Sequence, residues 1–258
     1  MSTLKALGQR ILALGLSAMA AACASLPEPS TSMALGAAAA PPSGFVVFCR
    51  AQPEACGATA ADLEAMDRAL RSAERASAVA AIRFDWSGVF SQTPPIASAP
   101  PAAPAPSASS ASAASPAMTP QLWTRINRVN TRVNRAIVRR TDADTYGRSE
   151  VWATPLASGA GFGDCEDYVL EKRRTLLAEG LPATALSIAV VITPHNERHA
   201  VLLVGTDAGE YVLDNLTPWV LPWNKTSYQW RERQVAGSAG RWASPAGAAQ
   251  PLLLASLR

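Results

Sequence analysis

The sequence predicts an α+β domain in which helices precede an antiparallel sheet. Helical periodicity recurs in three segments up to Gly180, and three β-rich segments follow in close succession at 186–192, 199–204 and 210–216. Helices and strands segregated in this way along a chain are typical of α+β folds. The 258 residues suffice for one domain with a substantial core, or for two small ones.

The charge balance is mild. The chain has 23 Lys and Arg residues against 20 Asp and Glu, for a formal net charge of +3. A nucleic-acid partner is therefore not expected, because nucleic-acid-binding proteins concentrate positive charge. Hydrophobic residues make up 48% of the chain, but much of this is alanine in low-complexity stretches, so the figure overstates the core.

Residues 1–23 have the features of an export signal. Lys5 and Arg10 charge the first stretch, and ILALGLSAMAAA supplies an apolar run of 12 residues, too short to span a bilayer. Small residues then precede Cys23, as at a lipoprotein cleavage site, although Ala20 stands where leucine is usual. Lipid attachment through Cys23 and ordinary cleavage nearby both remain open. In either case we expect a periplasmic or secreted protein without a transmembrane helix.

The cysteines suggest one structural pair and one unpaired thiol. Cys49 and Cys56 lie seven apart in a polar, proline-containing loop, FCRAQPEACG. In an oxidising compartment such a pair favours a small disulfide loop over two free thiols. Cys165 is left without a structural partner, and a lone thiol in an exported protein needs a reason.

The first half of the chain alternates low-complexity and ordered segments. Residues 24–43 are rich in Ser, Ala and Pro and predict a disordered tether. The short apolar run FVVFC, 45–49, is interpreted as a strand or an extended packed segment. Residues 59–82 have helical spacing, whereas 93–118 are almost entirely Pro, Ala and Ser and predict a disordered insertion.

A second helix is predicted from Thr119, which suits an N-cap, with Pro120 in the first turn. Three asparagines off its apolar stripe are interpreted as a polar face: Asn127, Asn130 and Asn134. The stripe itself consists of Leu122, Ile126, Val129, Val133 and Ile137.

A third helix of about 14 residues is expected to start at the turn GFGDCEDY, 161–168, and to end at Gly180, a favourable C-terminal cap. The last segment, 236–258, is interpreted as a tail.

Hairpin geometry distinguishes the two histidines of the chain. Asp207 and Gly209 predict a tight turn between the second and third β-rich segments. Such a turn pairs residue 205 with residue 210, and this register makes Asp214 the diagonal neighbour of His199 on one face of the sheet, within reach of a hydrogen bond. A one-residue slip would send Asp214 to the other face. His195 precedes the strand and is expected in a loop.

A thiol at a helix start, an imidazole and a carboxylate form the set that a cysteine nucleophile needs. The helix dipole and the imidazole favour the thiolate, and the carboxylate orients the imidazole. Gly161 and Gly163 would permit a tight turn whose amides, including that of Cys165, could stabilise an oxyanion. The alternative is that Cys165, His199 and Asp214 are a buried thiol, a core histidine and a turn former.

Several long, ordered motifs resemble those of the bacterial transglutaminase-like cysteine proteinases. They are GDCEDYVLEKRRTLLAEGLPATALSIAVV, HAVLLV, YVLDNL and LPW, preceded by INRVNTRVNRAI, DADTYG and VWATPL, and the match runs from about Leu122 to about Gln234. The FC…C segment near residue 49 also fits. The resemblance implies a papain/transglutaminase-like fold, in which a helix carrying Cys packs on an antiparallel sheet carrying His and Asp. We therefore expect one domain at 44–235, interrupted by the insertion at 93–118.

The resemblance also implies roles: Cys165 as nucleophile, His199 as base and Asp214 as orienting acid. Well-known members are periplasmic proteases that cut large surface adhesins, release biofilm cells and are restrained by an inner-membrane cyclic-di-GMP receptor. In that branch acids flanking the nucleophile bind calcium, and Asp164 and Glu166 match those positions. Without a cation, Asp164 would act as the N-cap of the helix, and the negative charges of Glu166 and Asp167 in its first turn would interact favourably with the helix dipole. No organic cofactor is expected.

Two other functions remain open at this stage. One is a transglutaminase-type acyl transferase, which shares the acyl-enzyme but passes it to an amine. The other is a noncatalytic binding module on the same scaffold. Trp219, Trp223 and Trp230 follow Asp214 and could line a substrate cleft, although buried packing is the commoner use of such residues.

Overall fold

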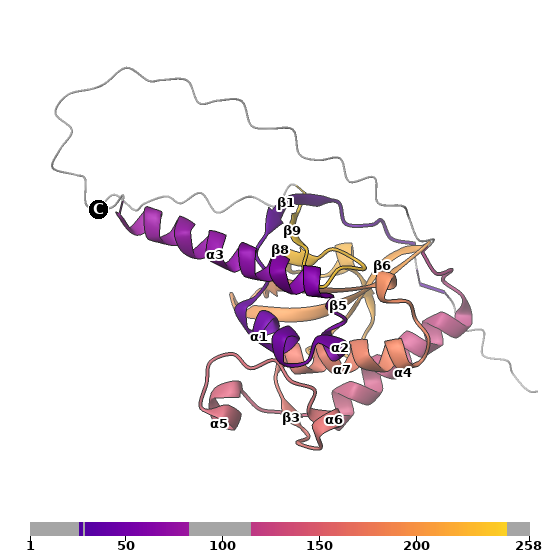
Figure 1. Cartoon of the computed structure of the whole chain (residues 1–258). Helices are drawn as coiled ribbons and strands as arrows, with labels where there is room; N and C mark the ends of the chain where they lie inside the picture. Colours follow the sequence, from indigo (N-terminus) through magenta and orange to yellow (C-terminus); the bar gives the residue numbers. More distant parts are fainter. Residues whose placement is uncertain (1–25, 28, 83–114, 247–258) are drawn as a thin grey trace, which may run out of the picture.

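The computed structural model describes residues 26–27, 29–82 and 115–246 (Figure 1). The predicted export signal and residues 93–114 of the predicted insertion lie outside these ranges. None of the helices in the described ranges is both long and apolar enough to cross a membrane.

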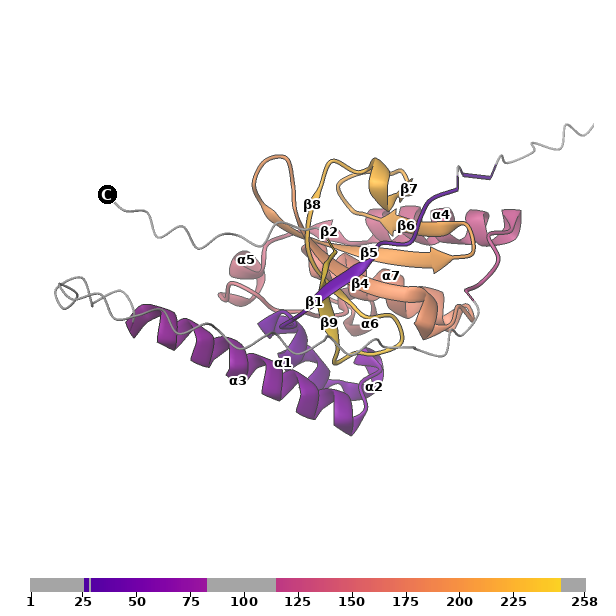
Figure 2. The ribbon, with the colours of Figure 1, turned by 90° about the horizontal axis from the view of Figure 1, so that it is seen from above.

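A seven-stranded sheet organises the described chain, with the order β1-β9-β8-β4-β5-β6-β7 and antiparallel neighbours throughout (Figures 1 and 2). Its strands are β1 Leu35–Ala39, β4 Leu186–Ile192, β5 Arg198–Thr206, β6 Gly209–Leu213, β7 Leu221–Pro222, β8 Gln229–Gln234 and β9 Trp242–Pro245. A separate parallel pair joins β2 Val138–Arg139 to β3 Phe162–Gly163.

The α-helices are α1 Ser43–Ala51, α2 Pro53–Cys56, α3 Ala60–Ile82, α4 Pro120–Ala136, α5 Asp142–Tyr146, α6 Pro155–Ser158 and α7 Cys165–Ala178. Two short 3-10 turns, η2 Ala183–Ala185 and η3 Trp223–Lys225, complete the set. Helix α7 packs on β5, and α4 packs on α7 and β6. This α+β arrangement confirms the predicted fold class.

The central strands confirm the predicted segments and their register. Gly205 pairs with Glu210 across the β5–β6 turn, as the hairpin prediction requires. Because side chains alternate along a strand, β4, β5 and β6 contribute to two cores. Ile188, Leu202 and Leu213 join the large core beneath the helices, whereas Ala189, Val201 and Val212 join a smaller core on the opposite face.

Helix α4 begins where the sequence predicted. The Thr119 side chain accepts a hydrogen bond from Leu122 N, and all five residues of the apolar stripe are buried. The polar-face interpretation is wrong for Asn130, which is fully buried, and incomplete for Asn134, whose Nδ2 donates to the Asp214 carbonyl at 2.8 Å. Both asparagines face the end of β6.

Three other predictions need correction. Residues 45–49 lie in helix α1, because a short apolar run fits a buried helical face as well as a strand. The predicted tether at 24–43 includes strand β1 and the start of α1, and the predicted tail includes β9, its partner. The domain therefore extends beyond 44–235 at both ends.

The chain before β1 also contacts the sheet. Ser30 N donates to the Ala208 carbonyl at the β5–β6 turn, and Met33 N donates to Glu210 Oε2. The end of the predicted insertion is ordered too: Met118 is buried, and its backbone N–H donates to Asp207 Oδ1. These segments escaped detection because their partners are distant in sequence.

Cys49 and Cys56 form the predicted disulfide, which joins α1 to α2. Both cysteines are buried, and Arg173 of α7 donates to the Ala55 carbonyl in the bridged segment. The bridge therefore fixes a layer that packs against the helix carrying Cys165.

Replacing Cys49 and Cys56 together by alanine should lower the free energy of unfolding. The bridge closes a loop of sequence separation 7. Its loss should lower the free energy of unfolding by about 2–3 kcal/mol, because the unfolded chain gains conformational entropy. Urea unfolding of the two proteins measures the difference. Val47→Ser, on the exposed side of α1, is the control and should stay near wild type. Equal midpoints for the wild type and the double variant would refute the stabilising role.

Candidate active site

Cys165 is the first residue of helix α7, and Asp164 is its N-cap. The approach from β3 depends on two glycines. Gly161 has φ +72°, a left-handed conformation that favours glycine. A Cβ on Gly163 would lie 2.4 Å from Asp167 Oδ2, so only glycine allows this carboxylate to fold back over the turn.

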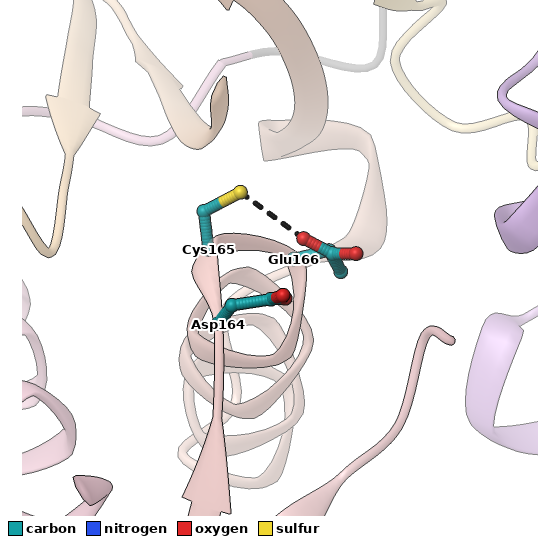
Figure 3. A group of neighbouring side chains, drawn as sticks. All are labelled: Asp164, Cys165 and Glu166. Atoms are coloured by element: carbon teal, nitrogen blue, oxygen red, sulfur yellow. Dashed lines mark hydrogen bonds between the residues drawn. The ribbon is translucent and has the colours of Figure 1, made fainter. Parts of the chain in front are cut away.

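The thiol is half-buried and lies beside acids (Figure 3). Its Sγ donates to Glu166 Oε2 at 3.0 Å. Burial, and then the Glu166 carboxylate, raise the pKa of Cys165 well above its ordinary value, while the Ala200 amide opposes the rise. In this arrangement the thiol form is favoured, contrary to the thiolate expected from the helix dipole alone.

His199 and Asp214 meet as the hairpin register predicted. His199 Nε2 lies 2.7 Å from Asp214 Oδ1, and both side chains are buried. Asp214 accepts further hydrogen bonds from Leu216 N and from the Tyr228 hydroxyl. Burial alone would raise the pKa of Asp214, but the bonds to His199, Leu216 and Tyr228 lower it below its ordinary value.

Cys165 and His199 line one cavity of about 270 Å³, together with Trp152, Arg198 and Ala200. Since Nε2 of His199 is engaged by Asp214, Nδ1 is the ring nitrogen left for a substrate or the thiol. His195 is exposed in the turn between β4 and β5, as expected for a loop residue.

Tyr228 is a site residue that the sequence analysis missed. It lies before β8, its hydroxyl binds Asp214 Oδ2, and its ring centroid is 6.0 Å from that of His199. Burial and the Asp214 carboxylate raise the pKa of Tyr228, so it remains a hydrogen-bond donor. Its distance from the other motifs along the chain left no local signal for this role.

Lys172 is a second missed residue, two turns along α7 from Cys165. Its side chain is fully buried, and its Nζ has no hydrogen-bond partner within the described ranges. Burial lowers the pKa of Lys172 to about 7, although the charge of Asp214 opposes this. The sequence did contain a signal for this residue, since a spacing of seven on a predicted helix places Lys172 on the same face as Cys165.

The acids around the thiol form two groups that overlap at Asp164. Oxygens of Asp142, Asp164 and Asp167 all lie within 4.8 Å of one another, as do ligand atoms of Asp164, Cys165 and Glu166. Asp142, from α5, was not among the predicted metal ligands. The parallel β2–β3 pair and the Asp142 N–H, which donates to Asp164 Oδ2, bring α5 to the start of α7.

The first group fits a hard divalent cation. Asp142 Oδ1, Asp164 Oδ1 and Asp167 Oδ2 are buried and lack hydrogen-bond partners among the described residues. Burial first, and then the neighbouring carboxylates, raise the pKa of Asp142 and raise that of Asp167 to about 8. A cation bound by these oxygens would offset the repulsion between the buried carboxylates. Glu166 instead faces the thiol, a soft ligand that calcium does not favour.

The tryptophans after Asp214 occupy different environments. Trp223 and Trp230 pack edge to face, with ring centroids 6.0 Å apart, against the smaller core. Trp219 is 69% exposed. Packing is therefore the main role of the first two, and only Trp219 is free to form part of a cleft.

A family model described as bacterial transglutaminase-like cysteine proteinase BTLCP matches residues 103–249, more than half of the chain. Among solved structures, the chain is similar to calcium-bound LapG of Legionella pneumophila, with 26% identity over 47% of this chain and 68% of that chain, and a TM-score of 0.41. The chain is also similar to EGTA-treated LapG, with 25% identity over 44% of this chain and 63% of that chain, and a TM-score of 0.39. No curated protein matches this sequence. With TM-scores this low, the LapG structures assign no function to this chain.

The buried amine of Lys172 should make folding stability depend on pH. The unfolded lysine keeps its proton up to about pH 10.5, whereas the folded one releases it above about 7. At this residue the unfolded state thus binds more protons in this window, so the contribution of Lys172 to stability should rise with pH, by at most about 1.4 kcal/mol per pH unit.

Urea unfolding of the wild type and of Lys172→Met at pH 7 and pH 9 tests this expectation. The wild type should gain stability relative to the variant as the pH rises, while Lys225→Met, at an exposed position, should follow the wild type. Parallel pH dependences for the wild type and Lys172→Met would show that Lys172 titrates normally.

Proposed function

This chain belongs to the bacterial transglutaminase-like cysteine proteinase family, and we propose on that basis that it is an exported cysteine endopeptidase. Cys165 is the nucleophile, His199 the general base and Asp214 the acid that orients the imidazole. The observation that carries the proposal is the buried His199–Asp214 hydrogen bond of 2.7 Å, with Cys165 in the cavity that His199 lines.

The chemistry follows from these positions. The Cys165 thiol passes its proton to His199 Nδ1 as Sγ attacks the substrate carbonyl carbon. The Cys165 backbone N–H, at the start of α7, stabilises the oxyanion. Asp214 stabilises the imidazolium, which then protonates the departing amine and leaves a thioester on Cys165. Water, activated by His199, releases the acid product and regenerates the thiol.

Calcium is part of the proposal. Asp142, Asp164 and Asp167 would hold the ion, as their unpartnered buried oxygens support. Bound there, calcium supplies positive charge beside the start of α7, which offsets the acids that disfavour the thiolate. Glu166 as a further ligand remains a prediction from the family resemblance.

The cellular role proposed here rests on the sequence features. The predicted export signal and the Cys49–Cys56 bridge suit a periplasmic or secreted protein. A protein substrate follows from the peptidase family. Cleavage of a large surface adhesin, a link to biofilm release and restraint by a cyclic-di-GMP receptor remain predictions from the resemblance.

The triad proposal predicts a specific pattern among four variants. Cys165→Ala and His199→Ala should each reduce hydrolysis by at least about 10³-fold, because each removes a reacting group. Asp214→Asn should lose about 10²–10⁴-fold through a misoriented imidazole, and His195→Ala should retain most activity. Hydrolysis of a pool of synthetic peptides, followed by mass spectrometry, provides the measurement.

Circular dichroism of each variant separates inactivity from misfolding. An inactive His195→Ala beside an active His199→Ala would overturn the assignment of the base. Adding a primary amine to the same assay tests acyl transfer: amide products in place of acids would assign the chain to the transglutaminase-type alternative.

The calcium proposal predicts that metal-stripped protein binds calcium in titration calorimetry and gains thermal stability from it, more than from magnesium. Asp142→Asn and Asp167→Asn should each weaken binding at least about tenfold, since each removes a charged ligand. Asp144→Asn, on the same helix as Asp142 but outside the acidic group, is the matched control. Absence of calcium binding by the wild type would leave the acids as helix-capping groups.

Glu166→Gln distinguishes the two overlapping acidic groups. Loss of calcium affinity would assign Glu166 to the metal, as the resemblance predicts. Unchanged affinity would assign it to the thiol, as its hydrogen bond with Cys165 suggests.

A further inference from the structure

A second cavity lies beside Asp214, apart from the one that contains the thiol. Its volume is about 320 Å³, within the range of about 300–1,000 Å³ that is usual for ligand pockets. Asp214 and Tyr228 line it, whereas Cys165 and His199 line the other cavity. Asp214, which lines this cavity, forms a hydrogen bond with His199, which lines the other.

The walls of this cavity, which we name the Trp219 cavity, are largely apolar. Val212 and Leu221 contribute from β6 and β7, and Pro194 from the turn after β4. Leu216 and Trp219, which are 43% and 69% exposed, also line it. Exposed large apolar side chains gathered in one concave place mark a binding site.

The loop that carries Trp219 is held in place from α4. Asn134 Nδ2 donates to the Asp214 carbonyl at 2.8 Å, and Asn130 Nδ2 donates to the Pro218 carbonyl at 3.4 Å. Trp219 N donates to Thr217 Oγ1 within the loop. Asn130 is itself fully buried, so the exposed indole is presented by an anchored backbone.

We propose that the Trp219 cavity is a substrate subsite that receives a large apolar side chain, leucine or an aromatic residue, of the peptide being cut. This deepens the proposed function and rests on it. The Trp219 cavity shares no lining residue with the cavity that contains the thiol, so we assign the subsite to a position beyond the two residues that flank the scissile bond.

A peptide substrate is the occupant favoured by continuity with the reactive centre. Asp214 belongs both to the wall of the Trp219 cavity and to the hydrogen-bonded pair behind the thiol. The His199–Asp214 hydrogen bond therefore links the wall of the Trp219 cavity to the cavity that contains the thiol. A second copy of this chain, or a regulatory protein, is the competing occupant.

Cleavage of a pool of synthetic random dodecapeptides tests the subsite. Mass spectrometry of the products gives the residue preference at each position around the cut. The wild type should prefer large apolar residues at one position beyond the two that flank the cut. Trp219→Ala with Leu216→Ala should lose that preference, and kcat/KM for the best apolar peptides should fall about 10–100-fold. Preferences at the other positions should be unchanged.

Two controls keep the result specific. Leu35→Ala alters an equally exposed apolar residue on the edge strand β1, outside the cavity, and should match the wild type. Trp219→Phe should restore most of the preference. A wild type that cuts the pool without an apolar preference beyond the flanking positions, or a preference that the double variant keeps, would overturn the subsite.

Binding separates this proposal from the proposed function. Cys165→Ala cannot form an acyl-enzyme, so its retention of peptides from the same pool reports binding without cleavage. Apolar peptides retained by Cys165→Ala, and lost when Trp219→Ala is added, support the subsite even if the wild type cuts nothing. No selective retention, together with Trp219-dependent dimers in sedimentation, would identify a second copy as the occupant instead.

Discussion

The arrangement depends on one constraint: helix α7 is buried although it is rich in charge. Five ionisable residues of this helix have little or no exposed surface, namely Glu166, Asp167, Glu171, Lys172 and Arg173. Buried charge needs partners, so neighbouring segments are drawn onto the helix. The Glu171 carboxylate accepts hydrogen bonds from the backbone amides of Leu156 and Ala157. The Asp167 carboxylate accepts one from the backbone amide of Ala153. Arg173 donates one to a carbonyl in the segment that the disulfide closes. The loops that frame the thiol are thus held by the same helix that carries it.

Local information in the sequence was enough for the His199–Asp214 pair. The β5–β6 turn is short, and a two-residue repeat determines which side chains share a face. The cap and the stripe of α4 were equally local, since Thr119, Pro120 and the apolar spacing all lie within one segment. In these two cases the determinants lie close together along the chain, and the predicted features are present.

Other features depended on partners far along the chain. Strands β1 and β9 consist largely of small residues and pair with each other across most of the sequence, so neither has a distinctive pattern. Asp142 reaches the acidic group only because β2 and β3 pair. The burial of Asn130 and Asn134 follows from what α4 packs against, since spacing alone places them on its polar side. These are consequences of tertiary packing, which overrides local pattern.

The chain before β1 meets the sheet at the end opposite the reactive pair. Ser30 binds Ala208 at the turn of the β5–β6 hairpin, whereas His199 and Asp214 lie at the other end of the same two strands. At about 3.4 Å per residue, β5 separates these ends by roughly 20–25 Å. An anchor attached ahead of Leu26 would therefore hold the domain near the hairpin end, about one strand length from the reactive pair.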